Sequence, residues 1–197
     1  MSIADGEMTG KRRGERAGRR LLRRFGRGAE GSVVVEFAVL AIPFCLLVFA
    51  ILESCIAFGA QQMLANATDD VARQFRTGQI RPSDPPNLAF DEKLVSDKIC
   101  AKLEILVASG CPELVVDLKS YDTFKEAAAK RIDFKDGDID IDGFGVAVGT
   151  AGSINQLRVF YRWPVVTDFM RKSMSNLAGG KTLLFATVTW QNEPFDE

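Results

Sequence analysis

Histidine is the residue that this sequence lacks, since none occurs among its 197 residues. Without an imidazole, neither a Ser-His-Asp triad nor a Cys-His pair can be assembled. A zinc site is also disfavoured, because the four cysteines include no second pair near enough to complete one. A Ser-Lys pair stays open by composition, as in a membrane-anchored hydrolase, although no motif points to one. We therefore expect no catalytic residues, no metal ligands and no cofactor.

Basic residues are sparse relative to acids over most of the chain, but they dominate its beginning. Residues 1–31 hold nine Lys or Arg against four acids, whereas the remainder holds sixteen against twenty-two. A basic arm can bind nucleic acid or a membrane surface, or remain in the cytoplasm as the flank of a membrane helix. The arginines here lead directly into an apolar run, and no basic helix with interleaved aromatics follows. We therefore expect a basic cytoplasmic leader over 1–31 and no nucleic-acid partner.

One long apolar run follows this arm. Val33 to Leu52 is twenty residues with a single charge, Glu36, which matches the ~20 residues that a membrane-spanning helix needs. Pro43 should kink the helix locally, which neighbouring helices can accommodate. With the basic flank held in the cytoplasm, we expect a single-pass helix over 32–60 in a bacterial inner membrane, in contact with lipid. Residues 61–197 are then expected in the periplasm.

The cysteines agree with an exported domain. Cys45 and Cys55 fall in the apolar helix, where an unpaired cysteine behaves as a small hydrophobic residue. Cys100 and Cys111 lie eleven apart in the exported part, where an even pair is typical of a disulfide. We predict that these two are bonded; two free thiols are the alternative.

Four processing patterns compete over the apolar run. A secretory signal, a twin-arginine signal at Arg23-Arg24-Phe25 and a lipoprotein box ending at Cys55 all fit poorly, but remain alternatives. The fourth is "GSVVVEF", in which Gly31 is followed by Ser32, three valines, Glu36 and Phe37. This spacing resembles the processing site of type IV pilin-like precursors, which a membrane prepilin peptidase cuts after the glycine.

The same resemblance implies a role for Glu36. Cutting after Gly31 would create an α-amino group on Ser32, and in the assembled pilin family this cation is thought to pair with the glutamate of a neighbouring subunit. A carboxylate in hydrocarbon is costly unless it is paired, so such a residue favours assembly. The alternative is that Glu36 reaches back to the cytoplasmic interface as a snorkelling side chain.

A longer pattern carries a more specific resemblance. The run "GSVVVEFAVLAIPFCLLVFAILE", the following "LANATDDVARQFRTGQI" and the ending "LLFATVTWQNEPF" resemble the TadE-like family of minor pilins from tight-adherence (Flp) pilus systems. The sequence departs from the pattern in its long leader and in Glu30 directly before Gly31, and TadF and TadG proteins share much of the amino-terminal pattern. The resemblance implies a pilin-like protein whose partners are a prepilin peptidase, other pilins and inner-membrane assembly proteins. The main alternative is an unprocessed, signal-anchored periplasmic scaffold or binding protein.

The exported part begins with a continuation of the long helix. Apolar side chains recur at helical spacing through Phe75, so we expect the helix to continue to Arg76 and Gly78 to stop it. The segment 61–77 is therefore assigned to the continued helix. The apolar members of this stripe are Met63, Leu64, Ala67, Val71 and Phe75. A rigid polar linker should follow over 81–87, and then an amphipathic helix from Asp91 to Ser109 that Gly110 ends.

The remaining chain reads mainly as strands. Leu114 to Leu118 is one, Ile154 to Val165 alternates apolar and polar residues as a second, and Lys181 to Gln191 is a third. Val166 to Leu177 can form a short helix between the last two. The predicted fold class is α+β: a long amino-terminal helix, half membrane and half exported, packed on a small antiparallel sheet with one or two further helices.

Three segments imitate functional motifs. "DGDIDIDG" has Asp138, Asp140, Asp142 and Gly143 in calcium-loop spacing, but Gly149 occupies the twelfth position, where a bidentate glutamate is required. We interpret this segment instead as an edge strand with one acidic face. "GFGVAVGTAG" lacks the Lys-Ser/Thr of a phosphate loop, and "EAAAK" only favours a helix.

Overall fold

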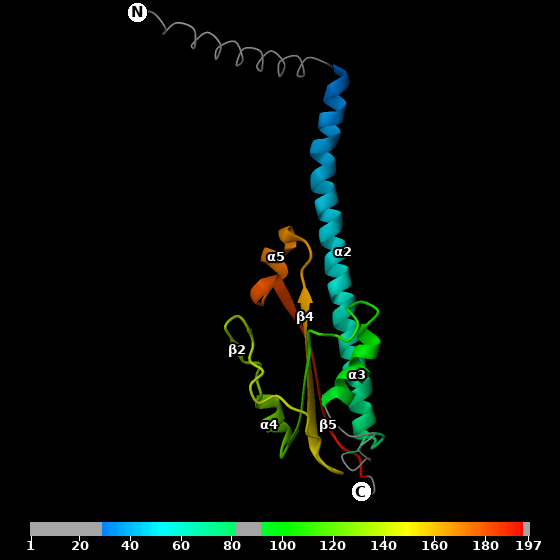
Figure 1. Cartoon of the computed structure of the whole chain (residues 1–197), viewed down its shortest axis with the longest axis vertical. Coiled ribbons are helices and arrows are strands. Elements are labelled where there is room, and N and C mark those ends of the chain that lie inside the picture. The colour runs from blue at the N-terminus through cyan, green and yellow to red at the C-terminus, as the bar shows by residue number, and fades with distance from the viewer. Residues whose placement is uncertain (1–28, 82–91, 195–197) are drawn as a thin grey trace, which may run out of the picture. The chain divides into compact units, whose positions relative to one another are not determined.

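A computed structural model describes residues 29–81 and 92–194. Most of the predicted leader 1–31 and of the linker 81–87 lies outside these ranges. The chain divides into two compact units, Met1–Phe49 and Ala50–Glu197. The described part of the first unit is a stretch of helix, whereas the second contains the helices and strands of an α+β domain (Figure 1). The predicted fold class is therefore confirmed.

The long helix α2 covers Ala29–Arg76 and includes Pro43 without a break in the assigned helix. Its end agrees with the prediction from the sequence. Gly78 adopts a positive φ of 67°, which costs glycine little, and the amides of Gly78 and Gln79 donate to the carbonyls of Phe75 and Gln74 at 3.1 and 2.9 Å. The chain thereby satisfies carbonyls that the last turn would otherwise leave without partners.

Three strands form the main sheet, in the order β1-β4-β5, with antiparallel pairing throughout. They are β1 (Leu114–Tyr121), β4 (Ile154–Pro164) and β5 (Lys181–Gln191). Val159, in the middle of β4, pairs with Val116 on one side and Ala186 on the other. The three predicted strands are all present, although the first is three residues longer than expected.

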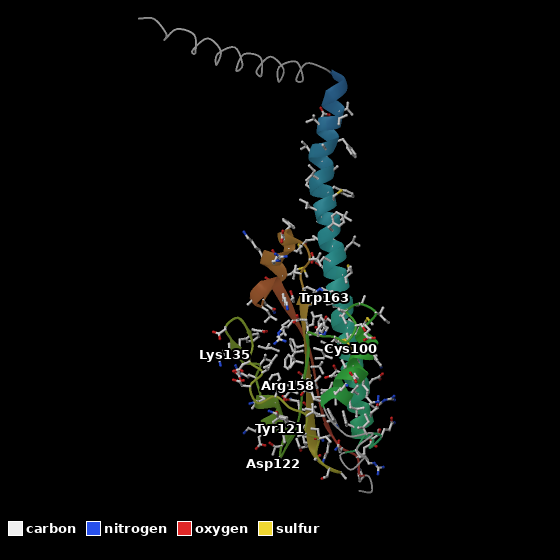
Figure 2. The ribbon with its side chains drawn as sticks, in the orientation of Figure 1. Cys100, Tyr121, Asp122, Lys135, Arg158 and Trp163 are labelled. Atoms are coloured by element: carbon white, nitrogen blue, oxygen red, sulfur yellow. A yellow bond between two sulfur atoms is a disulfide. The ribbon has the colours of Figure 1, made fainter. Side chains whose placement is uncertain are left out.

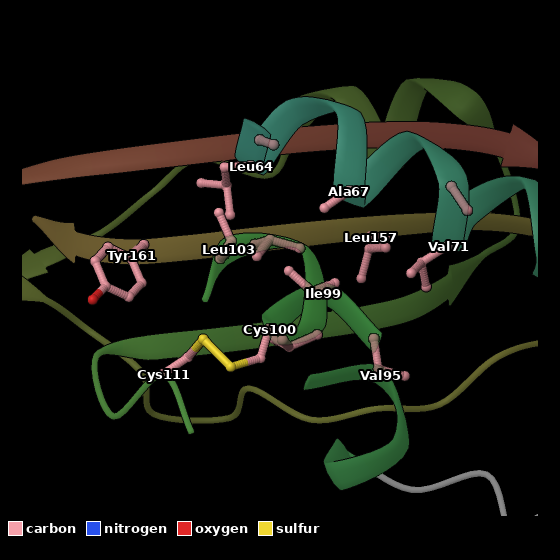
Figure 3. Close-up of a cluster of buried hydrophobic side chains, with 14 of the residues drawn as sticks. Leu64, Ala67, Val71, Val95, Ile99, Cys100, Leu103, Cys111, Leu157 and Tyr161 are labelled. Atoms are coloured by element: carbon pink, nitrogen blue, oxygen red, sulfur yellow. A yellow bond between two sulfur atoms is a disulfide. The ribbon is translucent and has the colours of Figure 1, made fainter. Parts of the chain in front are cut away.

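The carboxy-terminal half of α2 packs on one face of this sheet through a narrow stripe of side chains. Leu64, Ala67, Val71 and Phe75 are at most 1% exposed, and Met63 is partly buried beside them. They share one core with Leu157 of β4 and with side chains of a second helix, α3 (Glu92–Leu103) (Figure 3). The helical spacing of the stripe is thus explained by packing.

The opposite face of the sheet is covered as well. Phe160 and Leu183 form a second buried cluster with Ile139 and Leu177, and on the same face Gln156 and Arg158 are only 5% and 3% exposed. The polar residues Gln156 and Arg158, which alternate with the apolar ones along β4, therefore do not face solvent. A short helix, α4 (Phe124–Ala129), and a two-stranded ladder of β2 (Phe134–Lys135) and β3 (Asp138–Ile139) belong to this second layer.

The amphipathic helix after the linker is shorter than predicted, since α3 ends at Leu103 and not at Ser109. A helix continued to Ser109 would carry the chain about 13–14 Å beyond Cys100. Instead the Cys100–Cys111 disulfide requires the two Cα atoms to lie 5.8 Å apart. The chain therefore turns back, and the Glu104 carboxylate accepts hydrogen bonds from the Ser109 hydroxyl and the Gly110 amide at 3.2 and 3.0 Å.

The segment "DGDIDIDG" is a tight hairpin turn and not an edge strand of the main sheet. Asp136 and Gly137 connect β2 to β3 with φ angles of 53° and 79°. Ile139 is buried, but Ile141 is 48% exposed, so the two isoleucines do not share one apolar face as an alternating strand would require. The edge-strand interpretation therefore holds only for Asp138–Ile139, which pairs with β2, because two positive-φ residues reverse the chain where regular alternation was assumed.

Both edges of the main sheet are partly covered by other segments. On β5, the Gln61 side chain of α2 accepts from the Phe185 amide at 3.2 Å and donates to the Phe185 carbonyl at 2.8 Å. Asn176 accepts from the Leu183 amide at 2.8 Å. On β1, the amide of Leu118 donates to Gly145 at 2.8 Å and its carbonyl accepts from Ala147 at 2.7 Å.

The last helix in the chain is α5 (Asp168–Met174), which lies within the predicted range Val166 to Leu177. It begins directly after the end of β4 and is followed by a 3-10 turn, η2 (Ala178–Gly180), that leads into β5. None of its residues is buried.

Candidate functional site

The residues of the predicted processing site lie at the amino-terminal end of α2. Gly31 and Ser32 fall within the first turn of this helix, which begins at Ala29, and Glu36 and Phe37 lie about one to two turns further on. Glu36 is exposed, and Phe37 is 71% exposed. The helix brings the four residues of the motif onto one short segment at its start, as their spacing in the sequence requires.

The segment after Glu36 is apolar and exposed around its whole circumference. Helical side chains at consecutive positions point in all directions, and Leu40, Ile42, Phe44 and Leu47 are each between 59% and 71% exposed. In the part of the chain that the structure describes, α2 is the one helix long and apolar enough to cross a membrane. An apolar surface of this extent is stable in hydrocarbon and not in water, so α2 indicates a single-pass membrane anchor.

The character of the helix changes at Glu53. Its carboxylate accepts hydrogen bonds from the amides of Val166 and Thr167, at 2.5 and 3.2 Å, and from the Thr167 hydroxyl. One turn later Ala57 is 6% exposed, and Ala60 is 1% exposed. Exposed apolar surface therefore gives way to the domain core within about two turns, and Glu53 marks the change by fixing the segment before α5.

The predicted disulfide is present between Cys100 and Cys111, while Cys45 and Cys55 are free and exposed on α2. The bond joins α3 to the turn that precedes β1, and both half-cystines lie in the main core (Figure 3). It holds α3 close to the sheet to which β1 belongs.

The carboxylates of the calcium-like segment are held by other groups. Asp138 accepts from the Arg162 guanidinium at 2.9 Å and from the Ile139 amide at 2.8 Å. The Arg162 hydrogen bond holds the pKa of Asp138 below its usual value, against the smaller opposing effect of burial. Asp142 lies 3.8 Å from the Lys135 amine. Within residues 29–81 and 92–194 no three candidate metal ligands converge.

A cavity of about 350 Å³ lies at the end of β4. Tyr161, Trp163 and Pro164 contribute to its lining from the strand, Leu106 from the turn after α3, and Val166 from the segment before α5. The lining is largely aromatic and aliphatic, although Glu113, Arg162 and Lys181 also contribute to it, so the cavity suits a mainly apolar group.

The sequence analysis missed the most deeply buried ion pair. The Arg158 guanidinium donates to the Asp117 carboxylate at 3.0 and 2.6 Å, and the two side chains are 3% and 1% exposed. Arg158 also donates to the Arg131 carbonyl at 3.2 Å and lies 5.2 Å from the Phe144 ring centroid (Figure 2). One signal was available, because Asp117 interrupts the otherwise apolar start of β1, but its partner depends on strand register.

A comparison with protein-family models finds a match to one segment of the chain. Residues 31–73 match the model described as TadE-like protein. No characterised protein and no solved structure matches the chain. The match begins at Gly31, covers the whole exposed apolar run and ends within the buried stripe of α2. The amino-terminal part of this chain, from Gly31 to Arg73, is therefore TadE-like.

Proposed function

We propose that this protein is a TadE-like minor pilin that acts in the biogenesis of a tight-adherence pilus. The observation that carries the proposal is the TadE-like match over residues 31–73. The structure is consistent with that match, since the Gly31 and Glu36 motif stands at the start of a helix with an exposed apolar surface. In this role the chain is not an enzyme. It takes no cofactor and no nucleic acid, and its work is done through contacts with other proteins and with lipid.

The proposed orientation places the basic leader in the cytoplasm and the α+β domain in the periplasm. The excess of Lys and Arg before α2 supports this, since cytoplasmic flanks of membrane helices carry such an excess. The Cys100–Cys111 bond supports it independently, because structural disulfides persist in oxidising compartments. The membrane is then the bacterial inner membrane.

Processing would proceed by cleavage after Gly31. A prepilin peptidase would hydrolyse the Gly31–Ser32 peptide bond, leaving a carboxylate on the leader and an α-amino group on Ser32. In an assembly, that cation would pair with Glu36 of a neighbouring copy or another pilin, and the pair would lower the cost of both charges in hydrocarbon. Other pilins and inner-membrane assembly proteins are the proposed partners.

The test is the amino terminus of the protein recovered from membranes, with and without the cognate prepilin peptidase. We expect Ser32 as the first residue only when the peptidase is present, and an intact leader in the Gly31→Leu variant. Gly59→Leu is the matched control in the same helix, since a Cβ at Gly59 meets nothing within 4 Å. An intact leader under both conditions would contradict the processing mechanism.

The role of Glu36 is tested separately by Glu36→Gln, which removes the charge and keeps the shape. We expect normal membrane insertion but loss of pilus assembly, with Glu92→Gln on the exposed start of α3 as the control. Assembly that proceeds unchanged in Glu36→Gln would favour the snorkelling interpretation.

The second candidate function is an unprocessed, signal-anchored binding protein of the periplasm. The apolar cavity at the end of β4 favours it, because its volume of about 350 Å³ is within the range of small-ligand sites. The two candidates separate on the same amino-terminal measurement, since a binding protein of this kind keeps its leader.

A further inference from the structure

The helix α5 presents apolar side chains to its surroundings without burying any. Val166, two residues before it, is 78% exposed, and Phe169 in its first turn is 64% exposed. Arg171 and Lys172 are exposed on its second half, and Arg171 pairs with the Asp168 carboxylate of the same helix at 2.8 Å. An aromatic and a branched aliphatic residue on so short a segment, next to the Lys172 cation, form a surface that suits a partner with both apolar and anionic groups.

The location of α5 follows from its hydrogen bonds to the long helix. Glu53 is the first residue after the apolar run, and its carboxylate holds the amides of Val166 and Thr167. At the other end of α5, the Ser54 hydroxyl lies 3.8 Å from the sulfur of Met174. Both ends of α5 therefore contact α2 immediately after its apolar run, all within the second unit (Figure 1).

This position corresponds to the headgroup layer of a bilayer. Beyond the hydrocarbon core that layer extends for about 5–8 Å on each side, which equals the axial rise of roughly four or five helical residues. Residues 53 and 54 fall within that distance of the end of the run at Leu52. Aromatic residues favour this layer, and cations there are attracted to anionic lipid.

The turn after α3 extends the same surface. Leu106 lines the cavity at the end of β4 together with Val166, so the two segments lie close together. Ile105, next to Leu106, is 79% exposed. Two segments that are sixty residues apart in the sequence thus present exposed aliphatic side chains at the same end of the sheet.

We propose that Val166, Phe169 and Lys172, together with Ile105, form a lipid-contacting surface on which the exported domain rests against the bilayer that its own helix spans. The proposal rests on the membrane anchor of the proposed function, but it concerns a different part of the chain. The partner is the headgroup and upper acyl region of the outer leaflet. Phe169 and Val166 enter the apolar side of that layer, and Lys172 pairs with lipid phosphate.

The test uses the full chain in lipid vesicles. Cys45→Ser and Cys55→Ser remove both free thiols, so that Cys100 and Cys111 of the disulfide are the cysteines that remain. A single cysteine is introduced as Phe169→Cys, as Leu47→Cys in the apolar run, or as Phe124→Cys on α4, and labelled with an environment-sensitive fluorophore. Phe124 is 50% exposed. The Ala127 carbonyl of its helix accepts a hydrogen bond from the Gln156 side chain near the other end of β4, on the order of 25 Å from α5 along the strand.

Quenching by nitroxide lipids distinguishes the outcomes. We expect deep nitroxides to quench the label at residue 47, shallow nitroxides to quench the label at 169, and neither to quench the label at 124. Quenching at 47 without any at 169 would overturn the lipid surface while leaving the anchor intact. No quenching at 47 would instead contradict the anchor itself, and the surface with it.

Two further arms exclude a protein partner and test the chemistry. Dilution of the protein in lipid should leave quenching at 169 unchanged, whereas dependence on the protein-to-lipid ratio would assign the surface to a neighbouring subunit and overturn the proposal. Ile105→Asp with Val166→Asp should reduce the quenching at 169, and Lys172→Glu should reduce it only in vesicles that contain phosphatidylglycerol. If neither variant reduces the quenching of the label at residue 169, the lipid-contacting surface is contradicted.

Discussion

At the scale of single residues, the ion pair of Asp117 and Arg158 shows how a charged pair can be kept inside a small domain. Both side chains are almost fully buried, and the guanidinium also contacts the Arg131 carbonyl and the rings of Phe144 and Phe160. Taking two charges out of water is costly, and their attraction offsets that cost only while both partners are present. The pair therefore specifies how β1 and β4 must be aligned more than it adds net stability.

Removing one partner should be far more harmful than removing a surface charge. We predict that Asp117→Ala lowers the free energy of unfolding by about 3–5 kcal/mol, since it leaves a buried guanidinium without its carboxylate. Urea denaturation of the full chain in detergent, followed by near-UV circular dichroism, measures this loss. Asp122→Ala is the control. Asp122 is exposed and directly follows β1, so this variant should change the free energy of unfolding little. If Asp117→Ala and Asp122→Ala unfold at the same urea concentration, the prediction is contradicted.

The Asp138–Arg162 pair gives a pH dependence. Because the pKa of Asp138 is lowered in the folded protein, its contribution to stability is fully present above the unfolded pKa of about 3.9 and is lost as pH falls through the folded value. We predict that the stability difference between the wild type and Asp138→Asn is constant near neutral pH and shrinks towards zero in acid. The pair is partly exposed, so the difference should stay within about 1 kcal/mol. If the stability difference between the wild type and Asp138→Asn grew in acid, the pKa of Asp138 would be raised by folding and not lowered, which would contradict the prediction.

At the scale of elements, the long helix and the three main strands could be predicted with nearly all of their ends, whereas the end of α3 and the hairpin at Asp136 could not. Helical spacing through Phe75 and β-rich composition in β4 and β5 are local properties that a sequence displays directly. The end of α3 depends on the Cys100–Cys111 bond and on the Glu104 carboxylate, which meets Gly110 only after the chain has turned. The hairpin at Asp136 depends on positive φ angles, and the contact of Glu53 with Val166 joins residues 113 apart.

The disulfide should hold α3 and β1 together by restricting the unfolded chain. We predict that Cys100→Ser with Cys111→Ser lowers the free energy of unfolding by roughly 2–3 kcal/mol, as loop-closure models give for a link of this size. The loss should appear as a lower melting temperature of the non-reduced protein. Cys45→Ser with Cys55→Ser is the matched control, because these free thiols are exposed on α2. If reduction leaves the wild-type melting temperature unchanged, the bond does not contribute as proposed.

At the scale of the whole molecule, one chain combines a surface suited to hydrocarbon with a domain suited to water. We predict that Ile42→Arg, near the middle of the apolar run, impairs membrane insertion, since an arginine at the centre of a helix costs about 2.5–3.5 kcal/mol on insertion scales. The measurement is the fraction of protein that resists carbonate extraction from membranes. Phe124→Arg, on the exposed face of α4, should leave that fraction unchanged. Full retention of Ile42→Arg would argue against a spanning helix.

The hydrogen bonds between Gln61 and Phe185 have a consequence for how such molecules can join. An open sheet edge can recruit a strand from another chain, and uncontrolled recruitment leads to aggregation. Here a side chain of the long helix occupies the backbone groups of β5 at Phe185, and residues 145–147 do the same for Leu118 on the opposite edge. Strand addition is hindered at these two points, one on each edge of the sheet, which disfavours uncontrolled association of copies through a shared sheet.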